Sequence, residues 1–135
     1  MKKIKQHRML VLPIKKKWFD MIISGEKTEE YREIKQYYNS RFKKYMPRKT
    51  DFKKEEISPK FFIIFRNGYR YNDPQVICSC KLSVGMGKEK WGAQPGIKYY
   101  ILKITGIIEV QNINKGEEEE CRLLEEKDIV VKQQN

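Results

Sequence analysis

Short apolar runs separated by polar or glycine-containing segments recur along the first 110 residues of the chain. Residues 9–14 form the first run and predict a strand that stops near Pro13, because proline cannot donate a ladder hydrogen bond. In residues 15–24 the apolar positions instead recur at three- and four-residue spacing, which predicts an amphipathic helix. Gly25 follows directly and is placed to end this helix.

The next two patterns predict a strand and a second helix. Residues 28–32 favour a strand, and residues 34–45 show a helical spacing of aromatic side chains that Pro47 should end. The continuous apolar run at 61–65 is typical of a buried strand, and the Asn67-Gly68 pair after it is a strong signal for a tight turn.

Residues 76–84 and 99–110 predict two further strands, joined by a glycine-rich loop at 85–96. Several strands beside one short helix, and a second helix in the basic region, favour an α+β fold. We expect a small mixed β-barrel with flanking helices.

The length of 135 residues fits one domain with short extensions. We expect a basic N-terminal arm at 1–8, the folded domain at 9–112 and a charged C-terminal extension at 113–135. No run of 18 apolar residues exists, which excludes a membrane-spanning helix, and the apolar run after the basic arm is too short for a signal peptide. These features predict a cytoplasmic protein.

Charge is unevenly distributed along the chain, whose formal net charge is +11. Residues 1–70 carry 20 basic and 8 acidic side chains, whereas residues 71–135 carry 9 and 10. A strongly basic half favours a polyanionic partner, most often nucleic acid. The alternative is a lysine-rich surface that only confers solubility.

Cysteine and histidine mainly exclude functions. The three cysteines, without a secretory signal, indicate reduced thiols, and Cys78 and Cys80 should share one face of a strand as buried small side chains. Zinc needs four ligands, and no second cysteine or histidine pair has suitable spacing. We therefore expect neither a metal site nor a cofactor.

The segment from Gly25 to Arg32 concentrates candidate chemistry. If a strand follows the helix, Glu30 and Arg32 lie on one face because the side-chain period is two, and Lys27 at the turn can lean toward them. Two cations around one carboxylate form a compact polar cluster in which a partly desolvated Lys27 loses its proton more easily. The alternative is an ion-pair network that only fixes the turn.

These residues resemble a known family. Gly25-x-Lys27-x-x-Glu30-x-Arg32 matches the G-x-K-x-x-E-x-R signature of ASCH domains, which belong to the PUA-like superfamily. The helix before the motif, the segment at 31–38 after it, and later blocks at 65–69 and 87–92 resemble a bacterial and phage branch of this family. The resemblance covers residues 9–110.

The resemblance implies a small β-barrel with flanking helices and a cleft that contains the motif. It also implies an action on RNA or nucleotides. One branch hydrolyses 4-acetylcytidine with a lysine, a threonine and a glutamate; its lysine corresponds to Lys27, and where it has threonine this chain has Glu30. A metal-assisted ribonuclease is another proposal within the family, for which this chain offers only Glu30 and Glu33 near the motif as oxygen ligands.

Residues after the third predicted strand interleave cations and aromatic rings, a mixture that suits phosphate contact and base stacking. The alternative is a turn whose tyrosines cover the end of the barrel, and the indole in the glycine-rich loop is equally suited to stacking or to packing. The predicted nucleic-acid contacts are Lys35, Arg41, Lys43, Lys44, Arg48, Lys49, Arg66, Tyr69, Arg70 and Trp91.

Three functional hypotheses follow. The first is a domain that binds RNA or a nucleotide, with single-stranded RNA favoured, through a basic cleft around Gly25, Lys27, Glu30 and Arg32. The second is a hydrolase of RNA or of a modified nucleoside, in which Lys27 activates the nucleophile or stabilises an oxyanion and Glu30 is the general base. The third is a domain whose basic face binds an acidic protein.

Overall fold

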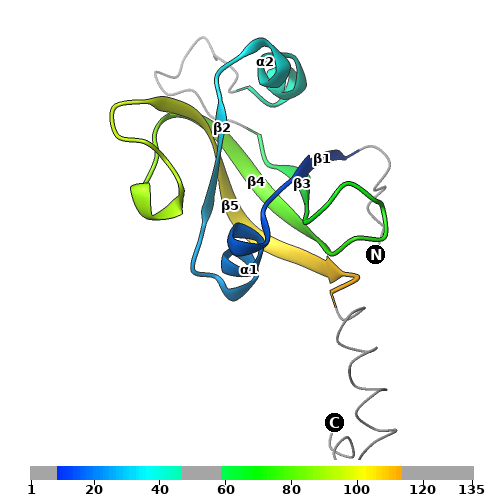
Figure 1. Ribbon diagram of the computed structural model, residues 1–135. Helices are drawn as coiled ribbons and strands as arrows, with labels where there is room; N and C mark the ends of the chain where they lie inside the picture. The colour runs from blue at the N-terminus through cyan, green and yellow to red at the C-terminus, as the bar shows by residue number, and fades with distance from the viewer. Residues whose placement is uncertain (1–8, 47–58, 114–135) are drawn as a thin grey trace, which may run out of the picture.

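The computed structural model describes residues 9–46 and 59–113, which form one curved sheet with two α-helices (Figure 1). The predicted arm at 1–8, Pro47, Arg48 and Lys49, and all but the first residue of the predicted C-terminal extension lie outside the described residues. Within them, the elements in chain order are β1 (Leu10–Pro13), α1 (Lys16–Ser24), β2 (Glu29–Glu33), α2 (Gln36–Phe42), the 3₁₀ turn η2 (Lys43–Tyr45), β3 (Phe61–Arg66), β4 (Gln75–Met86), the 3₁₀ turn η3 (Glu89–Trp91) and β5 (Lys98–Gln111).

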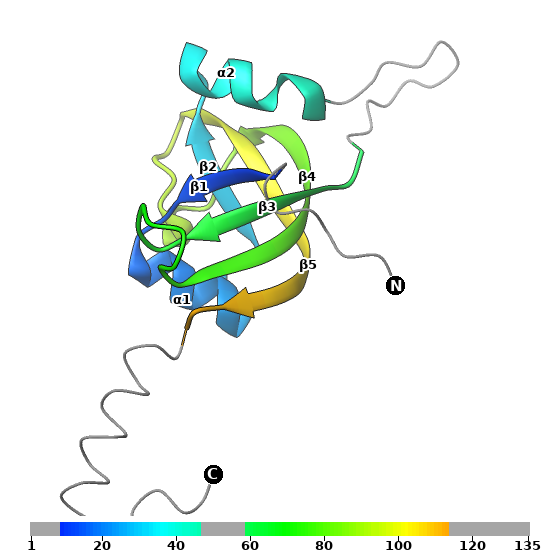
Figure 2. The same cartoon turned by 90° about the vertical axis from the view of Figure 1, so that its right-hand side faces the viewer.

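The sheet has five strands in the order β1-β3-β4-β5-β2. β1 pairs with β3 in parallel, and the other three pairings are antiparallel. β4 and β5 are the longest strands and bend strongly. The sheet therefore curls, and its two edge strands, β1 and β2, approach each other (Figures 1 and 2). α1 and α2 lie at opposite ends of this curled sheet (Figure 2).

The predicted α+β class is confirmed, whereas the sheet does not close into a barrel. β1 and β2 remain edge strands of the ladder. A side chain links them instead, because Arg32 Nη2 on β2 donates to the carbonyl oxygen of Pro13 on β1 at 2.7 Å. Short apolar runs predict strands, but the register that would close a sheet depends on strand tilt and shear, which those runs do not encode.

The helices follow the predicted pattern with one difference. α1 buries Phe19 and Ile22 and ends at Gly25, whose φ of 87° lies in the left-handed region and whose N–H donates to the Ile22 carbonyl at 3.1 Å. The helix predicted over 34–45 is divided into α2 and η2, because the chain tightens into a 3₁₀ turn after Phe42.

The concave side of the sheet holds the core. Alternate residues of β4, including Cys78 and Cys80, point inward against Leu102 and Tyr100 of β5 and against Phe19 of α1. The two thiols are buried on one face, as predicted, and burial raises the pKa of Cys78 to about 12. No helix within residues 9–46 and 59–113 has the length and apolarity needed to cross a membrane.

Candidate functional site at the seam between the edge strands

β2 presents its two faces to different surroundings. Glu30 is the register partner of Leu102 and Arg32 that of Tyr100, and directly opposed residues of an antiparallel pair share a face. Leu102 and Tyr100 are buried in the core, so Glu30 and Arg32 also point inward. Glu29, Tyr31 and Glu33 therefore point to the outer face of the strand.

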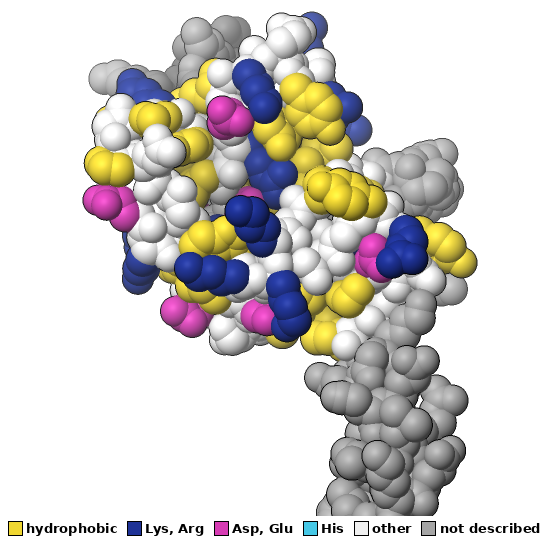
Figure 3. Space-filling model, viewed as in Figure 1, with side chains coloured by type: hydrophobic (Ala, Val, Ile, Leu, Met, Phe, Trp, Pro, Cys, Tyr) yellow, Lys and Arg dark blue, Asp and Glu magenta, His cyan; other side chains and the backbone are white. Residues whose placement is uncertain are grey.

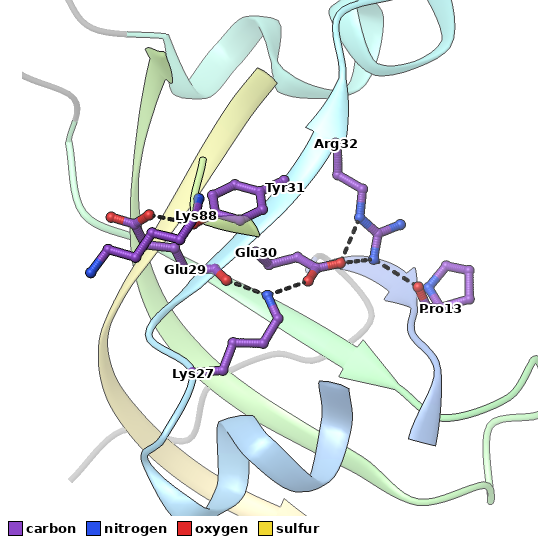
Figure 4. Close-up of polar contacts among 7 residues, drawn as sticks. All are labelled: Pro13, Lys27, Glu29, Glu30, Tyr31, Arg32 and Lys88. Atoms are coloured by element: carbon purple, nitrogen blue, oxygen red, sulfur yellow. Dashed lines mark hydrogen bonds and ion pairs between the residues drawn. The ribbon is translucent and has the colours of Figure 1, made fainter. Parts of the chain in front are cut away.

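The place where β1 and β2 approach each other, joined by the contact of Arg32 with Pro13, is here called the seam. Lys27, Glu30 and Arg32, here called the seam cluster, form one chain of hydrogen bonds (Figure 4). Lys27 Nζ donates to Glu30 Oε1 at 2.9 Å and to the carbonyl oxygen of Glu29. Glu30 Oε2 accepts from Arg32 Nε at 3.0 Å and from Arg32 Nη2 at 2.8 Å. Both oxygens of the carboxylate are thus held by cations, which is the arrangement that the motif spacing predicted.

Arg32 also ties three elements together. Its Nη2 bonds the Pro13 carbonyl on β1, and its Nη1 donates to the hydroxyl of Tyr38 on α2 at 3.1 Å. A guanidinium has five N–H donors, and these contacts use four of them. Among the described residues, the fifth N–H of Arg32 has no acceptor.

Lys27 is enclosed by aromatic rings. Its side chain is 0% exposed, and Nζ lies 5.4 Å from the ring centre of Trp18 and 5.2 Å from that of Tyr31. Burial lowers the pKa of Lys27 from its usual 10.5, with Arg32 acting in the same direction and Glu30 opposing both. The ammonium has three protons, of which two are committed to Glu29 and Glu30.

The seam cluster has two cations and one carboxylate, and none of its side chains is more than 11% exposed. The Glu29 carboxylate lies on the outer face, where it accepts from Tyr31 Oη at 2.7 Å, and it acts on Lys27 only through its charge, which opposes the lowering of the Lys27 pKa. An uncompensated buried charge is unfavourable unless an anion or a strong acceptor joins it or a proton leaves. The cluster is therefore suited to receive an acceptor group or to release a proton from Lys27.

The glycine-rich loop lies against Trp18 and Tyr31, the two rings beside Lys27. A Cβ on Gly87 would lie 2.7 Å from Cζ of Tyr31, and one on Gly92, whose φ is 102°, would lie 3.1 Å from Cζ2 of Trp18. The backbone N–H of Lys88 donates to Tyr31 Oη at 2.9 Å, which fixes this ring from the loop side. Both glycines let the loop approach the rings that surround Lys27.

Trp91 lies buried in this loop, so the packing alternative fits the structure and direct stacking of a base on its indole does not. Lys88 Nζ and Lys90 Nζ lie 4.7 and 4.9 Å from the centre of its ring. Trp91 Nε1 is a buried donor without a hydrogen-bond acceptor among the described residues.

The surface above the seam is hollowed. Figure 3 shows a recess beside β2, with basic side chains at its floor and hydrophobic side chains around it. The sequence predicted the three charged residues of this site but not its walls, which are Trp18, Tyr31 and Tyr38. The apolar spacing of the first helix assigned Trp18 to packing, and no local signal marks the Pro13 carbonyl as an acceptor 19 residues from Arg32.

The predicted nucleic-acid contacts lie in two groups. Lys35, Arg41, Lys43 and Lys44 are exposed on or next to α2 and η2, although Arg41 stacks 3.5 Å from the ring centre of Tyr37 and Lys35 pairs with Glu33 at 3.1 Å. The second group follows β3: Arg66 Nε donates to Gln75 Oε1 at 2.8 Å, while Tyr69 and Arg70 are exposed. Neither group contacts the seam cluster directly through a hydrogen bond or ion pair of the described residues.

Comparison of the chain with protein-family models, with curated proteins and with solved structures found no match. Within residues 9–46 and 59–113, no three histidine, cysteine or acidic side chains gather as a metal site would require.

Proposed function

We propose that this chain is a PUA-like domain of the ASCH type that binds single-stranded RNA, or a nucleotide within it, at the seam between β1 and β2. The observation that carries the proposal is the excess positive charge of the seam cluster, buried under a recess in the surface. Among the described residues one N–H of Arg32, whose side chain is 11% exposed, has no acceptor and can bind a group that enters the recess, while the fully buried Lys27 adds positive charge beside it. In this proposal the ligand lies between β1 and β2, the two edge strands of the sheet.

The surroundings of the recess support the same ligand class. Aromatic rings of Trp18, Tyr31 and Tyr38 surround the two cations, and a nucleotide combines an aromatic base with electron-rich oxygens. The basic side chains of α2 and η2 add a sequence-independent attraction for phosphates, in a protein whose net charge is +11. A protein partner with acidic side chains would use the charges but not the enclosed rings.

A second candidate function is hydrolysis of RNA or of a modified nucleoside at the same site. The observation that favours it is the burial of Lys27 beside Glu30 and Arg32, because this burial lowers the pKa of Lys27 and makes its ammonium release a proton more easily than an exposed lysine does. Glu30 is less suited to the role of general base, since both its oxygens already accept hydrogen bonds from Lys27 and Arg32. Lys27 is then the catalytic base and Arg32 stabilises developing negative charge.

The test compares two lysine variants of equal charge in binding to a labelled single-stranded RNA across a salt series. Lys27→Met removes the seam cation, and Lys81→Met removes an exposed one from β4. We expect Lys27→Met to weaken binding about tenfold or more and Lys81→Met to weaken it less than about threefold, since hydrogen bonds to charged groups contribute about 1.5–3 kcal/mol. Equal losses in the two variants would exclude the seam as the binding site.

The RNA is recovered after binding and analysed for cleavage, and acetylated nucleosides are incubated with the protein in parallel. Product formed by the wild type and not by Lys27→Met would identify the second candidate function. Failure of the wild type to bind RNA near physiological salt would reject the proposal and favour an acidic protein as the partner.

A further inference from the structure

The loop that joins β3 to β4, residues 67–74, carries the two most exposed large hydrophobic side chains of the described residues. Tyr69 is 87% exposed and Tyr71 is 83% exposed, with the exposed Arg70 between them. Isolated exposed aromatic residues are ordinary, but two rings that flank a guanidinium on one short loop form a surface with defined chemistry.

This loop is held rigidly although its tips are exposed. The backbone N–H of Asn67 donates to the Pro74 carbonyl at 2.8 Å, and the N–H of Arg70 donates to Asp73 Oδ2 at 3.0 Å. Directly after β5, Asn112 Nδ2 donates to the carbonyl oxygens of Tyr71 at 3.4 Å and of Asp73 at 3.2 Å. The conformation that presents the tyrosines is thus set before any partner arrives, which lowers the entropic cost of binding.

Gly68 makes this conformation specific to the sequence. Its φ is 135°, and a Cβ at this position would lie 2.1 Å from Asp73 Oδ2, the atom that accepts from the Arg70 backbone. Any larger residue would displace the Asp73 side chain that organises the loop.

The loop is anchored to the strand end that forms the seam. Asn67 Nδ2 donates to the Ile14 carbonyl at 3.0 Å, and the Ile14 N–H donates to the Arg66 carbonyl at 2.8 Å. The residue before Ile14 is Pro13, whose carbonyl accepts from Arg32 of the seam cluster. Pro13 and Ile14 are consecutive, so this segment connects Asn67 of the loop with Arg32 of the seam cluster.

We infer that residues 67–74 form a second contact for single-stranded nucleic acid, in which bases flanking the nucleotide at the seam stack on Tyr69 and Tyr71. Arg70 contacts the phosphate between them; its only ion pair among the described residues is a 3.7 Å contact with Asp73, and its side chain remains 84% exposed. This inference rests on the proposed function and extends it from one nucleotide to a strand. Stacking requires only the flat face of a base, so the contact tolerates any sequence.

The test uses ligands of two lengths. A labelled oligouridylate of about 12 nucleotides reaches beyond the seam, whereas uridine monophosphate occupies the seam alone. We expect the double variant Tyr69→Ala/Tyr71→Ala to weaken oligouridylate binding about 30-fold, or about fivefold per ring, and to leave uridine monophosphate binding unchanged. The double variant Tyr69→Phe/Tyr71→Phe keeps the rings and should bind both ligands like the wild type.

Two further measurements identify the contact. Single-stranded DNA of equal sequence should lose affinity by a similar factor in the alanine variant, because stacking does not depend on the 2′-hydroxyl. Arg70→Ala should reduce the slope of log affinity against log salt by about 0.7, the value for one phosphate contact on a single strand. Photocrosslinking with iodouridine-substituted RNA should join the strand to Tyr69 or Tyr71.

The outcomes separate this inference from the proposed function. Oligouridylate binding that is weakened by Lys27→Met but not by the double alanine variant would overturn the inference and leave the seam site in place. Equal weakening of both ligands by the alanine variant would also overturn it, because the loop would then act on the seam itself. If the wild type binds neither ligand, the proposed function and the inference both fail.

Discussion

Two ion pairs of this protein have almost the same length and very different surroundings. Lys16 Nζ lies 2.7 Å from Asp20 Oδ2 on α1, where the side chains are 75% and 54% exposed. Arg32 Nη2 lies 2.8 Å from Glu30 Oε2 at the seam, where they are 11% and 9% exposed. Water solvates the first pair whether or not it forms, whereas the second has exchanged hydration for protein contacts.

Burial, rather than distance, decides how an ion pair affects the stability of the molecule. A buried pair is costly to assemble, and an apolar replacement of equal volume is often as stable. A cluster with one extra cation is costlier still. The seam cluster is therefore poorly explained as a stabilising device alone, and the proposed binding of a ligand at the seam would account for its excess charge.

The largest expected effect comes from removing the carboxylate on which the cluster depends. Glu30→Gln leaves Lys27 and Arg32 facing each other in a buried site, and we expect it to lower the free energy of unfolding by about 3 kcal/mol. The matched variant is Glu33→Gln, three positions along on the same strand, which loses only an exposed pair with Lys35 and should cost about 0.5 kcal/mol or less.

Denaturant unfolding of both variants at neutral pH measures the difference. Similar costs for Glu30→Gln and Glu33→Gln would mean that the seam is solvated in solution, and the argument from buried charge would fail. A fall in the free energy of unfolding in Glu30→Gln alone would support the burial of the seam charges.

The charged residues of the seam were predictable, and their connections were not. A strand period of two places Glu30 and Arg32 on one face, and the helix end at Gly25 brings Lys27 close to them. The link from Arg32 to the Pro13 carbonyl depends on how far the sheet curls, which is set by bends in β4 and β5. Local patterning contains no measure of that curvature.

Side chains with two chemically sensible roles were also undecidable from sequence. Trp91 suits stacking and packing equally until its loop is placed against Trp18 and Tyr31, which buries it. Tyr69 and Tyr71 presented the same choice and are exposed, on a loop fixed by hydrogen bonds between its backbone and the side chains of Asp73 and Asn112. Tertiary placement, rather than residue type, separates these cases.

A smaller effect on stability is expected from Lys27→Met, and the difference in stability between the two proteins should change with pH. In the folded protein the pKa of Lys27 lies below 10.5, so between the two values the unfolded chain binds more protons and stability rises with pH. Below this window the buried charge is a penalty that the variant lacks. We therefore expect the wild type to gain stability relative to Lys27→Met as the pH increases from neutral toward 10.5.

The difference between the two proteins is the quantity to measure, by denaturant unfolding at several pH values. Burial raises the pKa of Tyr31 and of Cys78 to about 12, so in both proteins these groups lower stability as the pH rises through their unfolded values. Subtraction removes the contribution of Cys78, and measurements below pH 10, the usual pKa of tyrosine, keep the contribution of Tyr31 small. A difference that does not change with pH would contradict the burial of the Lys27 charge.

The smallest effect is expected at the exposed pair of α1. Lys16 is the first residue of the helix, where a cation opposes the macrodipole, and no acidic residue lies in that turn. The attraction to Asp20 is offset by this repulsion, so Lys16→Ala should change the free energy of unfolding by about 0.5 kcal/mol or less. Thermal unfolding at low and high salt measures the change, which should shrink further as salt screens both terms. A loss as large as that of Glu30→Gln would show that exposed and buried pairs contribute alike, and the distinction drawn from their burial would not hold.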